Sequence, residues 1–210
     1  MHLNHTIRAV IWDMGGVIIR NSIPELRNRL AEKYGLTEDK LEEVVFGSPY
    51  SLKATLGEIS VDVLWENVRS TLNVNPADMP AFISDFWGAD RPDESLVEFI
   101  RTLRPAYKTG LLSNAYSDAR PSLNSRFPGL LSIFDVSLFS AEFGLAKPDP
   151  RFYNLILQKL GVSPSEAIFV DDFSENVKGA SAVGLFAIQY RNTNQARQAV
   201  IERLSSNGAE

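Results

Sequence analysis

From about residue 90 onward, short apolar runs alternate with amphipathic stretches of helical periodicity. This alternation is typical of parallel βαβ units, because a chain that adds a parallel strand to a sheet returns through a crossover helix. We predict strands at Ile7–Trp12, Lys108–Leu112, Val136–Phe139, Ile168–Val170 and Phe186–Gln189. The predicted fold class is α/β, with a doubly wound, Rossmann-like parallel sheet.

Helices are predicted between these strands and after the last one. Their ranges are Pro92–Leu103, Ala115–Arg126 with a break near Pro121, Pro150–Leu160, Ser174–Val183 and the remaining chain to the C-terminus. The ends of the helix at 150–160 are the clearest, because Asp149 can cap its first turn and Gly161 follows its last residue.

Residues 21–88 interrupt this alternation, because they show helical periodicity and no evident strand. We interpret them as a small helical cap domain inserted after the first strand, joined to the rest by loops that could hinge. The predicted domains are therefore an α/β core formed by residues 1–20 and 89–210, and a cap formed by residues 21–88.

Composition excludes several kinds of catalysis. The 210 residues include no cysteine, and the two histidines, His2 and His5, lie in a polar N-terminal stretch ahead of the first strand. Cysteine nucleophiles, disulfides, cysteine-ligated zinc and iron–sulfur clusters are thereby excluded, and a Ser-His-Asp triad is not expected. Catalysis by this chain would depend on carboxylates, lysine, hydroxyls, backbone amides and a bound hard cation.

Charge and hydropathy indicate an ordinary globular domain. The chain has 21 basic and 26 acidic residues, and the basic residues form no run or stripe, so no nucleic-acid partner is expected. The apolar runs are shorter than the roughly 18 residues that a membrane span needs, and the N-terminus lacks the apolar region of a signal peptide. We therefore expect a cytoplasmic protein without a membrane partner; the oligomeric state is left open.

The segments at the ends of the predicted strands are rich in polar residues and glycine. They are Asp13-Met14-Gly15-Gly16, Ser113-Asn114, Lys147 and Asp171-Asp172. Ligands of doubly wound sheets bind at the carboxyl ends of the strands, where these groups would suit Mg²⁺ and a phosphate. Taken singly, each group has a purely structural alternative, as a glycine turn, a helix cap or a solvated lysine.

Taken together and in this order, the motifs resemble those of the haloacid dehalogenase-like (HAD) hydrolase superfamily. The motifs are VIWDMGGVII, GLLSNA, LAKPDP and IFVDDFSENVKGASAVG, and they span most of the chain. The inserted helices resemble the family's α-helical cap of the first class. Within the family, the chain is similar to the branch of sugar-1-phosphate phosphatases and of the amino-terminal phosphatase domain of bifunctional epoxide hydrolases.

This resemblance implies a Mg²⁺-dependent phosphatase that acts on a small phosphorylated substrate. Asp13 would attack phosphorus to form an aspartyl-phosphate, and Lys147 would neutralise the negative charge of the nucleophile and the transition state. The implied metal ligands are Asp13, the Gly15 carbonyl and Asp172, with Asp171 on the metal or on one of its waters.

The resemblance also implies the phosphate-binding groups, which are Ser113, the amide of Asn114, Gly16 and Lys147. Asn176 would support this network of polar contacts. The substrate is not identified by the sequence; Tyr50 and Lys53, in a loop between two cap helices, are candidate specificity residues.

The chain departs from the family pattern at Gly15, where most of its phosphatases carry an aspartate that acts as general acid and base. Loss of such a group costs about 10²–10⁴ in rate, so we expect slow turnover of alkyl phosphates. The gap leaves two alternatives open, a metal-independent haloacid dehalogenase and a catalytically weakened phosphate-binding module. The adjacent Asp171 and Asp172 favour the phosphatase, because a dehalogenase needs no such pair.

Overall fold

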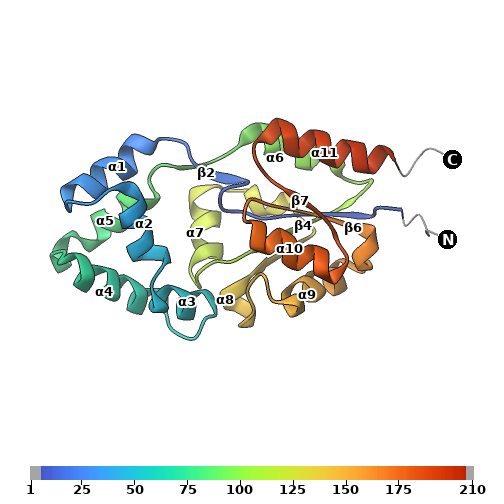
Figure 1. The fold of residues 1–210 in the computed structure, drawn as a ribbon. Coiled ribbons are helices and arrows are strands. Elements are labelled where there is room, and N and C mark those ends of the chain that lie inside the picture. Colours follow the sequence, from blue (N-terminus) through green and yellow to red (C-terminus); the bar gives the residue numbers. More distant parts are fainter. Residues whose placement is uncertain (1–5, 207–210) are drawn as a thin grey trace.

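A parallel sheet forms the centre of the computed structural model, which describes residues 6–206, so that His2 and His5 lie outside the described residues. Its 5 strands are β1 (Ala9–Trp12), β4 (Lys108–Ser113), β5 (Val136–Phe139), β6 (Ala167–Asp171) and β7 (Phe186–Gln189). They lie in the order β5-β4-β1-β6-β7, all neighbours being parallel (Figure 1). The predicted doubly wound α/β fold is thus confirmed.

Helices cover both faces of this sheet. One face packs against α6 (Glu94–Leu103), α7 (Ala119–Arg126) and α11 (Thr193–Ser205), and the other against α9 (Pro150–Leu160) and α10 (Ser174–Val183) (Figure 1). Along β1, Val10 and Trp12 belong to the first hydrophobic cluster, and Ala9 and Ile11 to the second. This alternation follows from the two-residue period of a strand, and it makes Trp12 a fully buried core residue.

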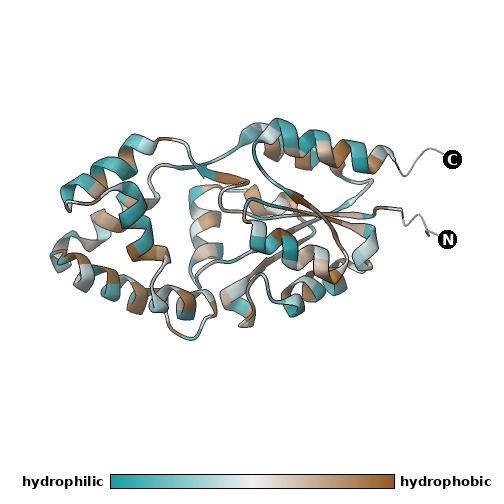
Figure 2. Cartoon of the chain, in the orientation of Figure 1, coloured by the Kyte–Doolittle hydropathy of each residue, from teal (hydrophilic) through white to brown (hydrophobic). Residues whose placement is uncertain are grey.

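The same amphipathic pattern is visible along the chain. Figure 2 shows helices that carry both hydrophobic and hydrophilic residues around a largely hydrophobic set of strands. The helix α9 has the predicted bounds, because Asp149 caps it by accepting from the N–H of Arg151 at 2.8 Å and Gly161 ends it in the left-handed region with φ 65°.

The inserted segment is helical, as predicted. It contains α1 (Pro24–Lys33), α2 (Glu38–Phe46), α3 (Pro49–Thr55), α4 (Val61–Leu72), the 3₁₀ turn η1 (Pro76–Asp78) and α5 (Met79–Trp87). These helices enclose a hydrophobic cluster of their own, which includes Trp65, Phe82 and Phe86. Figure 1 shows them at the end of the molecule opposite the two termini.

The connections into and out of this segment differ from the predicted loops. They pair as a short antiparallel ribbon of β2 (Ile19–Asn21) and β3 (Asp90–Pro92), with Arg20 opposite Arg91. Pro92 therefore belongs to a strand, and α6 begins at Glu94 with Asp93 as its cap. The ribbon escaped prediction because its three-residue strands are mostly polar and show no apolar alternation.

Further differences concern short elements. The predicted helix at 115–126 begins only at Ala119, which places Pro121 in the first turn of α7, where proline is tolerated. The helix α8 (Ser140–Phe143) and the 3₁₀ turns η2 (Leu130–Ile133) and η3 (Pro164–Glu166) were not predicted. Among residues 6–206, no helix combines the length and apolar character needed to cross a membrane.

Candidate active site

The carboxyl ends of three strands meet at the centre of the sheet. The strand β1 pairs with β4 on one side and with β6 on the other, and all three run in the same direction. Asp13 directly follows β1, Ser113 ends β4 and Asp171 ends β6. The topology thereby brings to one edge of the sheet residues that are far apart in the chain.

The side chain of Lys147 joins two of these ends. Lys147 lies between α8 and α9, and its Nζ donates to Asp13 Oδ1 at 2.6 Å and to Asp171 Oδ2 at 2.7 Å. The lysine side chain is only 1% exposed. Because a buried ammonium is costly without partners, the lysine and the two carboxylates form one interdependent unit.

The charges of this unit depend on burial. Burial raises the pKa of Asp13 to about 7, although the neighbouring Lys147 ammonium opposes the shift and the Asp171 carboxylate adds to it. For Lys147, burial lowers the pKa, but the two carboxylates outweigh it and the pKa is raised. Lys147 is therefore a cation at neutral pH, and further positive charge near Asp13 would favour its carboxylate form.

Three carboxylates offer a site for a metal ion. One oxygen each of Asp13, Asp171 and Asp172 lies within 4.8 Å of the others. The oxygens of Asp171 already accept from Lys147, from the N–H of Phe173 at 2.8 Å and from Asn176 Nδ2 at 3.1 Å. The carboxylate oxygens that can still bind a cation therefore belong mainly to Asp13 and Asp172.

The carboxylate of Asp172 shows whether this group of residues suits a metal ion. Its Oδ1 is buried and has no hydrogen-bond partner within residues 6–206, and burial raises the pKa of this carboxyl. A buried acceptor without a donor is unfavourable by about 1–3 kcal/mol, and more when it is charged. A hard divalent cation would satisfy it, and an all-oxygen donor set is the kind that Mg²⁺ prefers.

The segment after β1 folds back as a tight turn. The Met14 carbonyl accepts from the N–H groups of Ile18 and Ile19 at 2.9 and 2.8 Å, and the Gly16 N–H donates to the Ile19 carbonyl at 2.9 Å. That N–H is therefore engaged in the turn, which removes the donor through which Gly16 could bind phosphate. No donor within residues 6–206 bonds to the Gly15 carbonyl, which is the predicted backbone ligand of the metal.

Gly16 is required at its position for a different reason. Its φ is +75°, and a Cβ there would lie 2.2 Å from Asp172 Oδ2, so that only glycine lets Asp172 approach the turn. A Cβ at the neighbouring Gly15 would meet nothing within 4 Å. The two adjacent glycines thus differ in what a side chain would disturb.

We expect Gly16→Ala to weaken binding of Mg²⁺ by about 10- to 100-fold, the range for changes that displace a metal ligand indirectly. Isothermal titration calorimetry of the purified protein with Mg²⁺ would measure this. Gly15→Ala is the matched control and should keep the affinity of the unmodified protein. Equal affinities of the two variants would show that glycine at position 16 is not needed for metal binding.

Asn114 holds the Lys147 segment in place. Its Nδ2 donates to the Lys147 carbonyl at 2.9 Å, and its Oδ1 accepts from the Lys147 N–H at 2.8 Å. The side chain is therefore engaged with protein, and the backbone N–H is the group of Asn114 left for a phosphate. Sequence reasoning missed this pairing, because no local pattern links positions 33 residues apart. Ser113, beside it, is buried at the end of β4.

Asn176 lies in the first turn of α10. Its Nδ2 is 3.1 Å from both oxygens of Asp171, and its carbonyl accepts from the hydroxyl of Tyr153 at 2.8 Å. The structure thus places Asn176 in contact with Asp171, which in turn binds Lys147.

Tyr50 and Lys53 are not brought to this cluster by any contact that the structure describes. The predicted loop that carries them is instead the helix α3, on which both side chains are exposed, Tyr50 by 44%. Their role in specificity stays a prediction.

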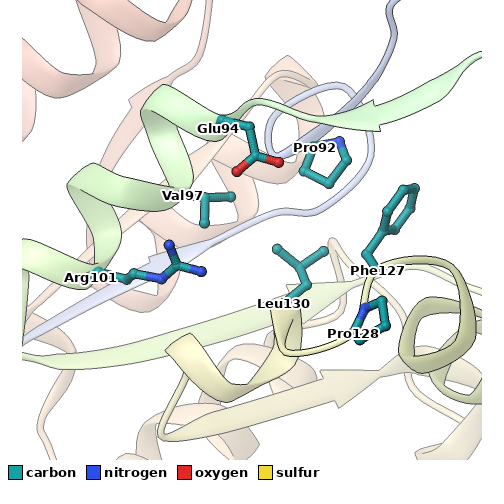
Figure 3. A pocket seen from close by; sticks show the side chains of 7 residues that line it. All are labelled: Pro92, Glu94, Val97, Arg101, Phe127, Pro128 and Leu130. Carbon is teal, nitrogen blue, oxygen red and sulfur yellow. The ribbon is translucent and has the colours of Figure 1, made fainter.

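A surface pocket of about 160 Å³ lies elsewhere on the core (Figure 3). It is lined by Glu94, Val97 and Arg101 of α6, by Pro92 of β3, and by Phe127, Pro128 and Leu130 after α7. None of the predicted site residues lines it, so the candidate active site remains the edge of the sheet around Asp13.

Comparisons with known proteins indicate a hydrolase, which agrees with this geometry. Residues 7–184 match a hydrolase family model described as haloacid dehalogenase-like hydrolase. The chain is 27% identical over 207 residues to bifunctional epoxide hydrolase 2 of Mus musculus, covering 90% of this chain and 37% of that protein. It is 39% identical over 108 residues to phosphatase MT3486 of Mycobacterium tuberculosis, covering 50% and 49% respectively. The chain thus spans less than half of the length of either curated relative.

A solved structure with a similar fold is that of the HAD family enzyme bt-2542 from Bacteroides thetaiotaomicron, in complex with magnesium and inorganic phosphate. The TM-score is 0.73 at 20% sequence identity, covering 88% of this chain and 94% of that one. At this identity the likeness establishes the fold.

Proposed function

Since the chain belongs to the haloacid dehalogenase-like hydrolase family, we propose that it is a Mg²⁺-dependent phosphatase that hydrolyses a small phosphorylated metabolite through an aspartyl-phosphate on Asp13. The observation that carries the proposal is the buried unit of Lys147 with Asp13 and Asp171, beside the Asp172 Oδ1 that has no hydrogen-bond partner within residues 6–206. The relative named a phosphatase, and the similar structure with magnesium and phosphate, support this reading.

Asp13 would be the nucleophile. Lys147 binds its Oδ1, which leaves the other carboxylate oxygen to attack phosphorus. That step forms an Asp13–O–P bond and breaks the bond between phosphorus and the leaving oxygen. Water then attacks phosphorus, which releases inorganic phosphate and restores the Asp13 carboxylate.

The remaining residues would hold the phosphoryl group and the charges around it. The Ser113 hydroxyl and the Asn114 N–H would donate to phosphate oxygens, while Lys147 offsets the negative charge of the transition state. Asp171 and Asn176 would act through Lys147, because their mutual contacts fix the lysine between its two carboxylates.

Asp13, the Gly15 carbonyl and Asp172 would hold the Mg²⁺, with Asp171 beside them. A bound Mg²⁺ supplies Lewis-acid stabilisation of charge on the phosphate oxygens. The buried Asp172 Oδ1 and the close approach of Gly16 are the structural grounds for this ligand set.

The helical segment would serve as a cap over the phosphate site. The proposed division assigns residues 1–20 and 89–210 to the core and residues 21–88 to the cap. It is supported by the separate hydrophobic cluster of the segment and by the ribbon of β2 and β3 at its base.

The position of Gly15 makes a gain of function possible. We expect Gly15→Asp to raise kcat for alkyl phosphates at least about tenfold, because it restores a general acid and base for the leaving oxygen. The change is sterically allowed, since a Cβ there meets nothing within 4 Å and the backbone is not in the left-handed region. Aryl phosphates, whose leaving groups need no proton, should gain less. If Gly15→Asp hydrolysed alkyl phosphates no faster than the unmodified protein, this role for position 15 would be refuted.

A panel of phosphorylated metabolites, with 4-nitrophenyl phosphate as reference, tests the proposed function. Release of inorganic phosphate that requires Mg²⁺ and stops with a chelator is the expected result. Halide release from 2-chloropropionate in the presence of chelator would instead indicate a dehalogenase. Phosphate binding without turnover of any substrate would indicate a binding module.

A further inference from the structure

Tyr116 belongs to the core by its position in the chain and to the cap by its packing. It lies in the loop after β4 that also contains Asn114. Its ring is only 8% exposed and packs within the hydrophobic cluster of the cap, together with Leu41, Val45 and Ala54. A core side chain is thus buried inside the cap.

The hydroxyl of Tyr116 makes polar contacts with two cap helices. It lies 2.9 Å from Ser51 Oγ on α3, and it donates to the Val45 carbonyl on α2 at 3.4 Å. Ser51 is itself only 4% exposed. Burial raises the pKa of Tyr116 to about 12, so the phenol stays neutral at physiological pH and can both donate and accept.

The backbone that carries Tyr116 is held on the side of the phosphate site. Ala115 donates its N–H to Ser140 Oγ at 2.9 Å, and its carbonyl accepts from the same hydroxyl at 3.1 Å. Ser140 is fully buried, and Asn114 is paired with the backbone of Lys147. The loop at 114–116 therefore connects the Lys147 segment to α3 through a short series of direct contacts.

The other end of α3 also rests on the core. A Cβ at Gly57, just after α3, would lie 2.3 Å from the carbonyl oxygen of Ala141, so the cap backbone touches α8 there. Ala141 is next to Ser140, whose hydroxyl holds Ala115. Both ends of α3 are thus seated beside the carboxyl ends of β4 and β5.

We propose that Tyr116 is a positioning residue that fixes α3 of the cap against the phosphate-binding end of β4. The inference rests on the proposed function and adds a determinant of substrate affinity to it. Loss of the Tyr116–Ser51 contact leaves Asp13 and Lys147 unchanged but lowers the fraction of molecules in which α3 is seated. Apparent affinity falls in proportion to that fraction, while the chemical step of a bound substrate keeps its rate.

The test uses Tyr116→Phe, Ser51→Ala and the double variant in the full chain. Tyr34→Phe is the matched control, because Tyr34 packs on the same cap cluster without a hydroxyl contact in the described part of the chain. Amide hydrogen exchange of residues 49–55 reports the seating of α3 without any need for turnover. Kinetics with 4-nitrophenyl phosphate, and inhibition by inorganic phosphate, report affinity.

Each single variant should raise exchange within α3 about fivefold, the effect of one hydrogen bond of ordinary net strength. The KM should rise by less than this factor, because affinity follows the seated fraction, and kcat should stay within about twofold of the unmodified protein. The double variant should equal Tyr116→Phe, because that change already removes the contact that Ser51→Ala removes, together with the contact to the Val45 carbonyl. Unchanged exchange and KM in Tyr116→Phe, or additive effects in the double variant, would overturn the inference. Absence of turnover by the unmodified protein would overturn the proposed function, and the exchange result would still decide the role of Tyr116.

Discussion

Replacing Asp13 with Asn should lower kcat for 4-nitrophenyl phosphate by at least about 10⁴-fold, because removal of the attacking group abolishes the covalent step. The side chain keeps its shape, and Lys147 retains its contact with Asp171 at 2.7 Å, so we expect the fold to persist. Steady-state kinetics, together with a thermal unfolding curve of the variant, measures both expectations.

The matched control for this experiment is Asp39→Asn. Asp39 is an exposed carboxylate of α2 in the cap, and the same chemical change there should leave kcat unaltered. If Asp13→Asn retained a tenth or so of the activity, Asp13 could not be the nucleophile, since a tenfold loss is smaller than even the loss of a general acid or base. The phosphoryl group would then have to reach water directly, without an aspartyl-phosphate.

The largest expected effect on stability belongs to Arg27, at the junction of cap and ribbon. Its guanidinium is buried, with Nη1 2.5 Å from Glu42 Oε1, and with Nη2 3.0 Å from Asp90 Oδ1 and 3.1 Å from the Phe86 carbonyl. Burial raises the pKa of Asp90, and Arg27 opposes that shift. Asp90 therefore depends on this arginine for charge compensation.

Arg27→Met should lower the free energy of unfolding by about 3–5 kcal/mol, because it leaves a buried carboxylate without its main partner. For a chain of this length, the corresponding fall in Tm is roughly 6–20 °C. Arg29→Met, on the exposed side of the same helix, is the control and should change the stability by no more than about 0.5 kcal/mol. Adding Asp90→Asn to Arg27→Met should recover part of the loss; equal melting of the two arginine variants would contradict the structural role of Arg27.

Much of the architecture could be predicted because it depends on local sequence patterns. The strands of the sheet are short buried runs, and the caps of α9 are individual residues at its two ends. The candidate site could be predicted for a related reason. In a doubly wound sheet, residues that follow the strands meet at one edge, so their positions in the chain already imply that Asp13, Ser113 and Asp171 lie together.

The ribbon of β2 and β3 could not be predicted, because three-residue polar strands have no periodicity to detect. Two features of Gly16 could not be predicted from the sequence either. Its N–H is engaged within its own turn, and only glycine fits beside Asp172. They depend on the path of the backbone after β1 and on where a separate segment, carrying Asp172, comes to lie.

The amino-acid sequence by itself determined the kinds of groups available for chemistry and the strand ends at which they occur. Only the tertiary structure decided how these groups are connected. Lys147 binds Asp13 across 134 positions of the chain, and Tyr116 meets Ser51 across 65. Such contacts have no local signature, because a buried charge or hydroxyl finds its partner through the packing of the whole chain, and that packing sets which polar groups can be satisfied.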